Sequence, residues 1–324
     1  MLVLGRADLE RLLDPRSVID AVEMAFRDAA AGRAVALPRA VLPMAKDKLF
    51  LGMVSLLPRQ RALGAKLITV VGDNRSRGLP TIHASYLLSD PETGAPLAFM
   101  EAGFLTALRT GAASALAARH LARPDARRVA CFGAGVQAEQ QLRCLQAVLP
   151  MERVRVVGRD AARAQAFASR MRQVLGVPVE ATTDRRAAVR DAGVVTCSTT
   201  APRPVFAGRD LPAGVHVDAV GAFRPATREV DTEGVRRAYV VVDTYEGAWE
   251  EAGDLLIPIK AREITRRHVK AELGEVVARK KPGRTSPEQI TLFKSVGWAP
   301  EDAATARLAY DRAMAQGIGT EVAL

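Results

Sequence analysis

The sequence predicts an α/β protein in which an N-terminal α+β domain is followed by a doubly wound parallel sheet. Three observations lead to this prediction. From Arg127 onward, short strands and helices alternate along the chain, which is typical of doubly wound folds. The strands there are continuously apolar, as in parallel sheets that are buried on both faces. A glycine-rich turn joins the first of these strands to a helix.

The composition is that of an ordinary globular protein. The chain has 324 residues, of which 48% are hydrophobic and 25% are charged, enough for two domains of common size. No apolar run approaches the roughly 20 residues that a membrane span requires, and the mixed, charged stretch Met1–Glu10 does not resemble a secretory signal. The formal net charge of +10 comes mostly from arginines interleaved with acids, which favours a solvated basic surface over a nucleic-acid interface.

The cysteines and histidines give no sign of a metal site or a disulfide framework, because no pair has the spacing of metal ligands. Cys131 and Cys197 fall in apolar strand patterns, and Cys144 falls on a helix. We expect all three to be small buried hydrophobes in a cytoplasmic protein with no metal, no membrane contact and no nucleic-acid partner.

The first domain is expected to open with a helix and to continue as a run of strands. Asp14 and Pro15 form a helix cap and a first-turn proline, and Gly32 ends that helix. A long helix, about Gly103 to Leu121, closes the domain. The predicted strands are Ala34–Leu42, Leu49–Leu56, Leu63–Val71, Thr81–Leu88 and Leu97–Met100.

The sequence places the second domain at residues 123–300. The first domain then covers residues 1–122, joined by a C-terminal helix of residues 301–324 whose clearest part is Glu301 to Met314. The predicted strands of the second domain are Arg128–Phe132, Val154–Val157, Val194–Thr199, Val215–Val220, Tyr239–Val242 and Thr291–Ser295. Its predicted helices run from the glycine-rich turn to Val148 and over Ala161–Leu175.

The turn Gly133-Ala134-Gly135-Val136-Gln137-Ala138 lies between a predicted strand and a predicted helix, and a second strand follows at the right distance. The first glycine permits the bend, the second lets the backbone approach a pyrophosphate, and the third position needs only a small side chain, here Ala138. N–H groups at the helix start favour the phosphate charge. We therefore predict a Rossmann-type dinucleotide site. Its expected cofactor contacts are Gly133, Gly135, Val136, Gln137, Arg159, Thr110, Thr199 and Val220.

The second strand ends in Gly158-Arg159-Asp160, where NAD enzymes usually carry a carboxylate for the ribose 2′-hydroxyl. Arg159 comes first here and suits a 2′-phosphate, with Arg163 one helical turn further on. Asp160 argues for NADH instead, unless it caps the following helix. We favour NADPH as the cofactor, with NADH as the alternative.

Alternation along Leu63–Val71 places Lys66, Ile68 and Val70 on one face of a strand. A buried lysine among aliphatic neighbours has a lowered pKa, which suits proton transfer. A lysine at a strand edge reaches water instead, and spacing alone leaves both interpretations open.

Two arginines lie in apolar surroundings and each requires a carboxylate partner. Arg39 falls inside a predicted strand, and Arg109 falls inside a mainly apolar helix. The partner is either a protein acid, such as Glu101, or the carboxylate of a substrate.

Five segments spread over most of the chain form a recognisable set: Gly64-Ala65-Lys66-Leu67-Ile68-Thr69-Val70, Gly78-Leu79-Pro80-Thr81, Leu108-Arg109-Thr110-Gly111-Ala112-Ala113-Ser114-Ala115, Gly133-Ala134-Gly135 and Leu292-Phe293-Lys294-Ser295-Val296-Gly297. Together they resemble the ornithine cyclodeaminase/mu-crystallin family. The resemblance implies a homodimer, a small-molecule substrate whose carboxylate is held by Arg39 and Arg109, and a Lys66 that contacts the reacting group. The family includes cyclodeaminases, alanine dehydrogenases, ketimine and pyrroline-carboxylate reductases and the mu-crystallins, so membership alone does not fix the reaction.

Two positions depart from the cyclodeaminase pattern. Cyclodeaminases place an acid where this chain has Ser55, and an aspartate where it has Phe223. Phenylalanine cannot accept the proton that must leave the side-chain amine of ornithine. The stretch around Phe223, followed by Arg228-Glu229-Val230-Asp231, is closer in style to the Δ1-pyrroline-2-carboxylate (ketimine) reductases.

We therefore expect NAD(P)H-dependent reduction of Δ1-pyrroline-2-carboxylate or Δ1-piperideine-2-carboxylate to L-proline or L-pipecolate. Lys66 and His83 are the expected catalytic residues, because histidine can donate a proton near neutral pH, although His83 also fits a structural role. Arg39, Lys66 and Arg109 are the expected substrate contacts. The alternatives are an alanine dehydrogenase-like enzyme, a cyclodeaminase, which Phe223 and Ser55 disfavour, and a mu-crystallin-like NADPH-dependent binding protein.

Overall fold

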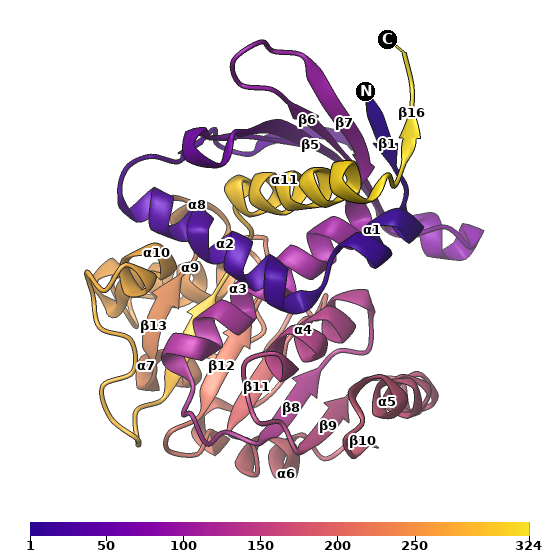
Figure 1. Cartoon of the computed structure of the whole chain (residues 1–324). Helices are drawn as coiled ribbons and strands as arrows, with labels where there is room; N and C mark the ends of the chain where they lie inside the picture. The colour runs from indigo at the N-terminus through magenta and orange to yellow at the C-terminus, as the bar shows by residue number, and fades with distance from the viewer. Residues whose placement is uncertain (324) are drawn as a thin grey trace. The chain divides into compact units, whose positions relative to one another are not determined.

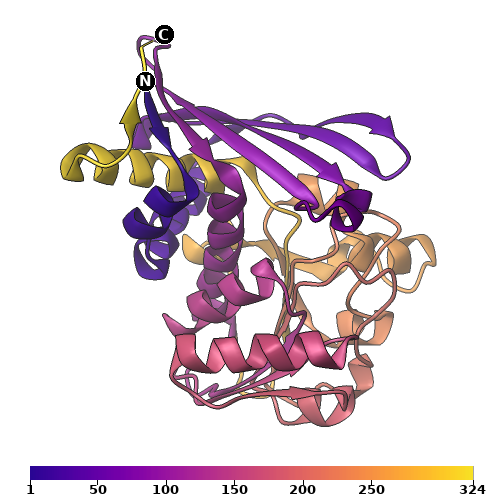
Figure 2. The ribbon, with the colours of Figure 1, turned by 90° about the vertical axis from the view of Figure 1, so that its right-hand side faces the viewer.

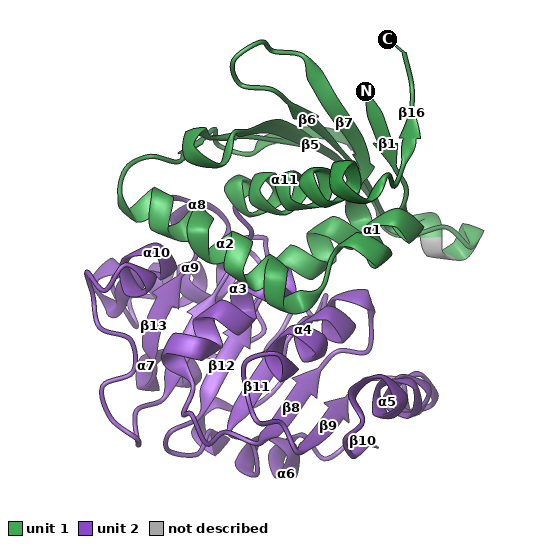
Figure 3. Cartoon of the chain, viewed as in Figure 1, with its two compact units in different colours: residues 1–109, 299–324 green, residues 110–298 purple. Residues whose placement is uncertain are grey.

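The computed structural model describes residues 1–323 of the chain, apart from the side chain of Arg75. The chain forms two compact units (Figure 3): unit 1 consists of residues 1–109 with the chain from Ala299 onward, and unit 2 is Thr110–Trp298. The division falls inside helix α3 (Ala102–Leu121), whereas the sequence placed the domain boundary between residues 122 and 123. Leu324, the last residue of the predicted C-terminal helix, lies outside the described residues.

Unit 1 is built on a mixed eight-stranded sheet with the order β16-β1-β7-β6-β5-β4-β2, in which β3 also pairs with β4. Strands β4 to β7 follow one another in antiparallel pairing, whereas β1 runs parallel to β7. The first and last strands pair with each other, so the two ends of the chain lie side by side (Figures 1 and 2). The strands are β1 (Leu2–Leu4), β2 (Val35–Ala36), β3 (Ala40–Ala45), β4 (Lys48–Leu57), β5 (Ala62–Val71), β6 (Ile82–Ser89), β7 (Pro96–Glu101) and β16 (Thr320–Glu321).

Helices cover one face of this sheet. α11 (Ala299–Gln316) packs along β4 and β5 (Figure 1), and α1 (Arg6–Leu12) and α2 (Pro15–Ala30) pack on α11. Asp14 caps α2 by accepting the N–H of Ser17, and Pro15 is the first residue of the helix, as the sequence predicted. The C-terminal helix therefore belongs to the N-terminal unit. It ends at Gln316 and not at residue 324 as predicted, because Gly317 and Gly319 take positive φ angles, and Thr320–Glu321 form β16.

The opposite face of the sheet, which we call the outer face, is apolar and exposed in the single chain. Val54, Ala65, Leu87 and Phe99 are direct neighbours across β4, β5, β6 and β7 on this face. Phe99 is 42% exposed, and Leu67, one step further along β5, is 46% exposed. A contiguous apolar patch of this kind is typical of a surface that another protein covers.

Unit 2 contains a parallel eight-stranded sheet with the order β10-β9-β8-β11-β12-β15-β13-β14. The chain moves outward from β8 to β10 and then returns to β11 on the other side of β8. Ligands bind to such sheets at the carboxyl ends of the strands beside this reversal. The predicted fold class is thereby confirmed. The strands are β8 (Arg128–Phe132), β9 (Arg153–Val157), β10 (Val179–Thr182), β11 (Val194–Cys197), β12 (His216–Ala219), β13 (Tyr239–Val242), β14 (Val269–Glu272) and β15 (Thr291–Lys294).

Successive side chains of β8 enter two different cores, which explains the continuously apolar strands. Val129 and Cys131 pack with residues of α4 and α5, whereas Ala130 and Phe132 join the core on the other face. All three cysteines are free and buried, as expected. Among residues 1–323, we find no helix that is long and apolar enough to span a membrane. The helices of unit 2 that follow α3 are α4 (Val136–Gln146), α5 (Ala161–Leu175), α6 (Arg185–Arg190), α7 (Thr232–Arg237), α8 (Tyr245–Glu251), α9 (Gly253–Lys260) and α10 (Leu273–Val277).

The structure corrects one predicted strand. Ala34–Leu42 is not continuous, because Pro38 lacks the N–H that a strand ladder requires, and Arg39 lies in the break between β2 and β3. β3 then continues to Ala45 and turns back into β4 at Asp47, which has a φ of 58°. The elements that the sequence did not predict, among them β10, β14 and α6 to α10, are eight residues long or shorter, so they show little periodicity.

Candidate active site

Lys66 lies in the middle of β5, on the face of the sheet that α11 covers. Its direct neighbours across the strands are Met53 on β4 and Tyr86 on β6. The Lys66 side chain has no exposed surface, and Ile68 and Val70 are buried on the same face. The interpretation of Lys66 as a strand-edge lysine that reaches water is therefore wrong.

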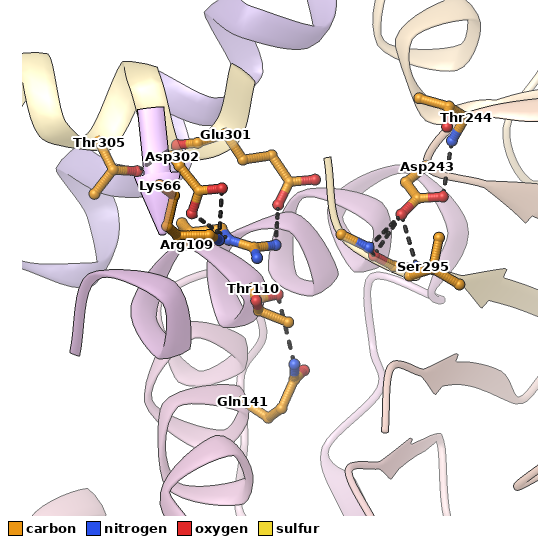
Figure 4. Close-up of polar contacts among 12 residues, drawn as sticks. Lys66, Arg109, Thr110, Gln141, Asp243, Thr244, Ser295, Glu301, Asp302 and Thr305 are labelled. Carbon is orange, nitrogen blue, oxygen red and sulfur yellow. Dashed lines mark hydrogen bonds and ion pairs between the residues drawn. The ribbon is translucent and has the colours of Figure 1, made fainter. Parts of the chain in front are cut away.

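Two neighbouring carboxylates at the start of α11 bind the buried cations (Figure 4). One oxygen of Asp302 lies 2.7 Å from Lys66 Nζ, and the other accepts a hydrogen bond of 2.9 Å from Arg109 Nε. Glu301 accepts a second hydrogen bond of 2.8 Å from Arg109 Nη1. All four side chains are at most 5% exposed. We call these four residues the buried charge cluster.

The sequence did not identify Glu301 and Asp302 as site residues. The signal that could have found them is a pair of acids at the start of an alanine-rich helix, directly after the Lys294–Gly297 motif. Glu101, the acid suggested for Arg109, instead accepts the backbone N–H groups of Gly103 and Phe104.

Burial sets the protonation of Lys66. It lowers the pKa of Lys66 to about 7, and the positive charges of Arg109 and Arg39 act in the same direction, whereas Asp302 opposes them. Burial also disfavours the charged form of Arg109, but Asp302 and Glu301 raise its pKa above the ordinary value. The cluster thus combines a permanent cation with an amine that can exchange a proton near neutral pH.

The cluster and Arg39 together favour an anionic ligand. Arg39 is half-buried and lies close enough to Lys66 to affect its pKa. When Lys66 is protonated, the cluster itself holds two cations and two carboxylates, and Arg39 adds positive charge nearby. The bonds to Asp302 and Glu301 use two of the five N–H donors of Arg109.

Tyr86 and Ser55 add two buried hydroxyls beside the cluster. Burial and the negative charge of Asp302 raise the pKa of Tyr86, which keeps its hydroxyl protonated. A Cβ on Gly64, directly opposite Ser55, would lie 2.5 Å from this hydroxyl, so the glycine makes room for it. Ser55 stands at the position where cyclodeaminases have an acid. It is buried, and its hydroxyl brings no negative charge to the cluster.

The structure does not bring His83 to Lys66. His83 is the cross-strand neighbour of Thr69, so it lies on the outer face, whereas Lys66 lies on the covered face. Its side chain is exposed in the single chain. Its catalytic role therefore has no geometric support here. Across residues 1–323, no group of three or more histidine, cysteine or acidic side chains could hold a metal ion.

The glycine-rich turn after β8 fits a dinucleotide. Gly133 has a φ of 126°, and a Cβ there would lie 2.9 Å from the carbonyl oxygen of Ser198. Gly135 caps α4 with its backbone alone, and Val136 and Gln137 form the first turn. Ala138 is fully buried in the core against β8 and β9. A pyrophosphate can thus approach the helix N-terminus closely.

Basic side chains lie at the end of β9. Arg159 is exposed, and an Nη of Arg163 lies 3.9 Å from the position of a Cβ on Gly135. Asp160 accepts the N–H of Arg163 at 3.0 Å and caps α5, as the capping interpretation predicted.

The other three expected cofactor contacts lie in unit 2, and their backbones are hydrogen-bonded within it. The carbonyl of Thr110 accepts from Gln141, and the N–H of Val220 donates to Cys197. Thr199 donates both its N–H and its hydroxyl to the buried carboxylate of Glu229. Phe223 packs half-buried on the adjoining apolar core.

Comparison with known proteins gives matches over nearly the whole chain. Residues 1–317 match the sequence profile of the ornithine cyclodeaminase/mu-crystallin family. The Δ1-pyrroline-2-carboxylate reductase of Bacillus cereus is 37% identical over 324 residues, 99% of this chain and 99% of that protein. The structure of the Thermococcus litoralis Δ1-pyrroline-2-carboxylate reductase with NADH and L-proline has a TM-score of 0.97 at 42% identity, covering 99% of this chain and 100% of that one. An archaeal alanine dehydrogenase dimer with bound NAD has a TM-score of 0.94 at 33% identity, covering 100% and 99%.

The buried charge cluster makes a prediction about stability. Asp302→Asn removes the carboxylate that Lys66 and Arg109 share, so we expect the free energy of unfolding to fall by about 3–5 kcal/mol. Chemical denaturation followed by circular dichroism measures this change. The matched control on the same helix is Asp311→Asn, which breaks an exposed i,i+4 pair with Arg307 and costs about 0.3–0.5 kcal/mol. Equal losses in the two variants would contradict the account of the cluster.

Proposed function

The chain belongs to the ornithine cyclodeaminase/mu-crystallin family, as its motifs predicted, and we propose that it is an oxidoreductase that reduces a cyclic imino acid with a nicotinamide cofactor. The substrate is Δ1-pyrroline-2-carboxylate or Δ1-piperideine-2-carboxylate, and the product is L-proline or L-pipecolate. The observation that carries this proposal is Lys66, a buried amine whose pKa is lowered to about 7 beside two arginines. Identities of 37% and 42% to full-length reductases of this kind support it.

The proposed chemistry divides between the charged groups and the cofactor. Arg39 and Arg109 hold the carboxylate of the substrate, which orients its C=N bond. When bound, the reduced nicotinamide supplies the hydride that the imine carbon accepts. The π bond of the imine breaks, its nitrogen takes a proton from the Lys66 ammonium, and Lys66 is left as the neutral amine. Asp302, 2.7 Å from Nζ, keeps the amine in place for this transfer.

Three alternatives within the family differ from this proposal. A cyclodeaminase needs a base for the side-chain amine of ornithine, and Ser55 and Phe223 cannot provide one. An amino-acid dehydrogenase of the alanine dehydrogenase kind forms its imine from ammonia, whereas a preformed cyclic imine needs no ammonia. A binding protein without turnover makes no use of a lysine with a lowered pKa.

The central test is turnover by the Lys66→Met variant. The substitution removes the proton donor, so we expect reduction of both cyclic imino acids to fall by about 10²–10⁴-fold while the cofactor still binds. The measurement is nicotinamide absorbance with NADPH and with NADH, together with a fluorescence titration of the cofactor. The control is Lys48→Met, on the neighbouring strand β4, whose lysine is partly exposed and pairs with Asp73.

Undiminished reduction by Lys66→Met would contradict the assigned role. Strict dependence of the wild-type rate on ammonia, with pyruvate as substrate, would favour the alanine dehydrogenase alternative.

We further propose that NADPH is preferred over NADH, and this preference rests on the arginines after β9. Asp160 is engaged in capping α5, which leaves Arg159 and Arg163 as the charged groups suited to a 2′-phosphate. The other expected cofactor contacts serve the parts that NADPH and NADH share. They are Gly133, Gly135, Val136, Gln137, Thr110, Thr199 and Val220.

This preference predicts the effect of Arg159→Ala. Loss of a charge-assisted hydrogen bond raises the KM for NADPH about tenfold and leaves the KM for NADH unchanged. Initial rates with each cofactor measure the difference. Arg170→Ala, on the exposed side of α5 where Arg170 pairs with Glu139, is the control. An equal change for both cofactors would refute a 2′-phosphate site at Arg159.

We also propose a cytoplasmic homodimer that buries the outer face of unit 1. The apolar row of Val54, Ala65, Leu87 and Phe99 supports this, because a two-fold interface buries the same patch of both subunits. The archaeal alanine dehydrogenase, 33% identical over nearly the whole chain, is a dimer, which supports a dimeric state for this chain.

The dimer proposal predicts that Leu67→Glu gives a monomer, because the charge would have to be buried in an apolar interface. Light scattering coupled to size exclusion measures the mass. Met314→Glu, at a residue of α11 that is 60% exposed, is the control and keeps the mass of the wild-type protein. A Leu67→Glu protein with unchanged mass, or a monomeric wild-type protein, would contradict the proposal.

A further inference from the structure

We infer that Glu229 is a positioning residue, whose buried carboxylate holds the loops after β11 and β12 in the one arrangement that the cofactor requires. Glu229 lies in the Arg228-Glu229-Val230-Asp231 motif, and the proposed chemistry does not use it. The inference rests on the proposed function in so far as these loops contact the nicotinamide cofactor.

The Glu229 carboxylate accepts hydrogen bonds from both loops. Oε1 accepts the N–H of Thr199 at 2.6 Å and its hydroxyl at 2.7 Å. Oε2 accepts the N–H of Gly221 at 2.7 Å and that of Ala222 at 3.2 Å. Thr199 follows β11, and Gly221 and Ala222 follow β12, so one carboxylate joins the carboxyl ends of two adjacent strands.

A second buried pair fixes Glu229 itself. One oxygen of Asp254 accepts the N–H groups of Glu229 and Val230 at 2.7 and 2.8 Å. The other oxygen lies 2.9 Å from Nζ of Lys294, which also donates to the carbonyl of Ala222 at 2.5 Å. Glu229, Asp254 and Lys294 are all at most 1% exposed. Two buried hydrogen bonds therefore hold the backbone on either side of the Glu229 side chain in place.

The two loops touch, and only glycine fits where they do. A Cβ on Gly221 would lie 2.3 Å from both the N and the O of Thr199, and 2.6 Å from Oε1 of Glu229. Since the loops leave no spare room, the four hydrogen bonds of Glu229 determine their separation.

This separation matters because ligands of doubly wound sheets lie at the carboxyl ends of the strands. A misplacement of about 1 Å in such a site can lower a rate about 10²-fold. A carboxylate that only stabilised the fold would change the unfolding midpoint and leave cofactor affinity alone. The two roles can therefore be separated by experiment.

The test is Glu229→Gln in the full-length protein. The amide must turn its NH2 group toward at least one backbone N–H donor, which pushes one loop away, so we expect the Kd for NADPH and for NADH to rise about tenfold and kcat to fall further. Fluorescence titration measures the Kd without any imino acid, and steady-state rates give kcat and KM. The control is Asp218→Asn, a fully buried carboxylate of β12 that bonds to His216 and touches neither loop. It lowers the unfolding midpoint and keeps the cofactor Kd of the wild-type protein.

A second variant covers the case in which Glu229→Gln does not fold. Gly221→Ala forces the loops apart without removing a charge, and the same rise in cofactor Kd is expected.

Wild-type Kd and kcat in a folded Glu229→Gln or Gly221→Ala protein would overturn the inference and leave the proposed function intact. A wild-type protein that binds NADPH but reduces neither imino acid would overturn the proposed function, while the effect of Glu229→Gln on Kd still decides the inference. A wild-type protein that binds neither nucleotide would overturn both.

Discussion

Two cations lie next to each other in the interior of unit 1, and a single carboxylate bonds to both. An ammonium and a guanidinium buried in this way would repel each other and lose their hydration unless a nearby anion compensated them. Asp302 offers one oxygen to Lys66 and the other to Arg109, and Glu301 adds a second bond to Arg109. The placement of α11 in unit 1 meets this need. The C-terminal helix has to return to the sheet that carries Lys66, because it brings both acids.

Asp302 offsets only part of the effect of burial and of Arg109 on the pKa of Lys66, and this leaves Lys66 able to exchange a proton. Burial and Arg109 lower the pKa of Lys66 more than Asp302 raises it, so the amine can give up a proton near neutral pH, while Arg109 stays charged and can bind an anion. Unit 2 uses a comparable arrangement for a different purpose. There the buried carboxylate of Glu229 accepts four hydrogen bonds from two loops, and Lys294 with Asp254 supports it. In each unit a buried acid holds groups of the proposed site, Lys66 and Arg109 in unit 1 and the proposed cofactor loops in unit 2.

Local patterns in the sequence predicted those features that depend on neighbouring residues. The alternation around Lys66, the small residue at Ala138 and the cap at Asp160 each follow from a few positions along the chain. The partner of Lys66 could not be predicted in this way, because Asp302 lies 236 positions further along the chain and meets it only through packing. His83 shows the same limit. It lies on a strand next to that of Lys66, but the pairing of β6 with β5 sets it opposite Thr69 and hence on the other face, and a register cannot be read from one strand alone.

The most direct test of this account is the titration of Lys66 itself. Protein labelled with ¹³C at the lysine side chains can be followed by NMR as the pH rises, and the signal that is missing from the spectrum of Lys66→Met identifies the residue. The account predicts a midpoint at about 7. A midpoint near 10.5, the ordinary value for a lysine, would show that the ammonium is not desolvated and would contradict the proton-donating role on which the proposed reaction depends.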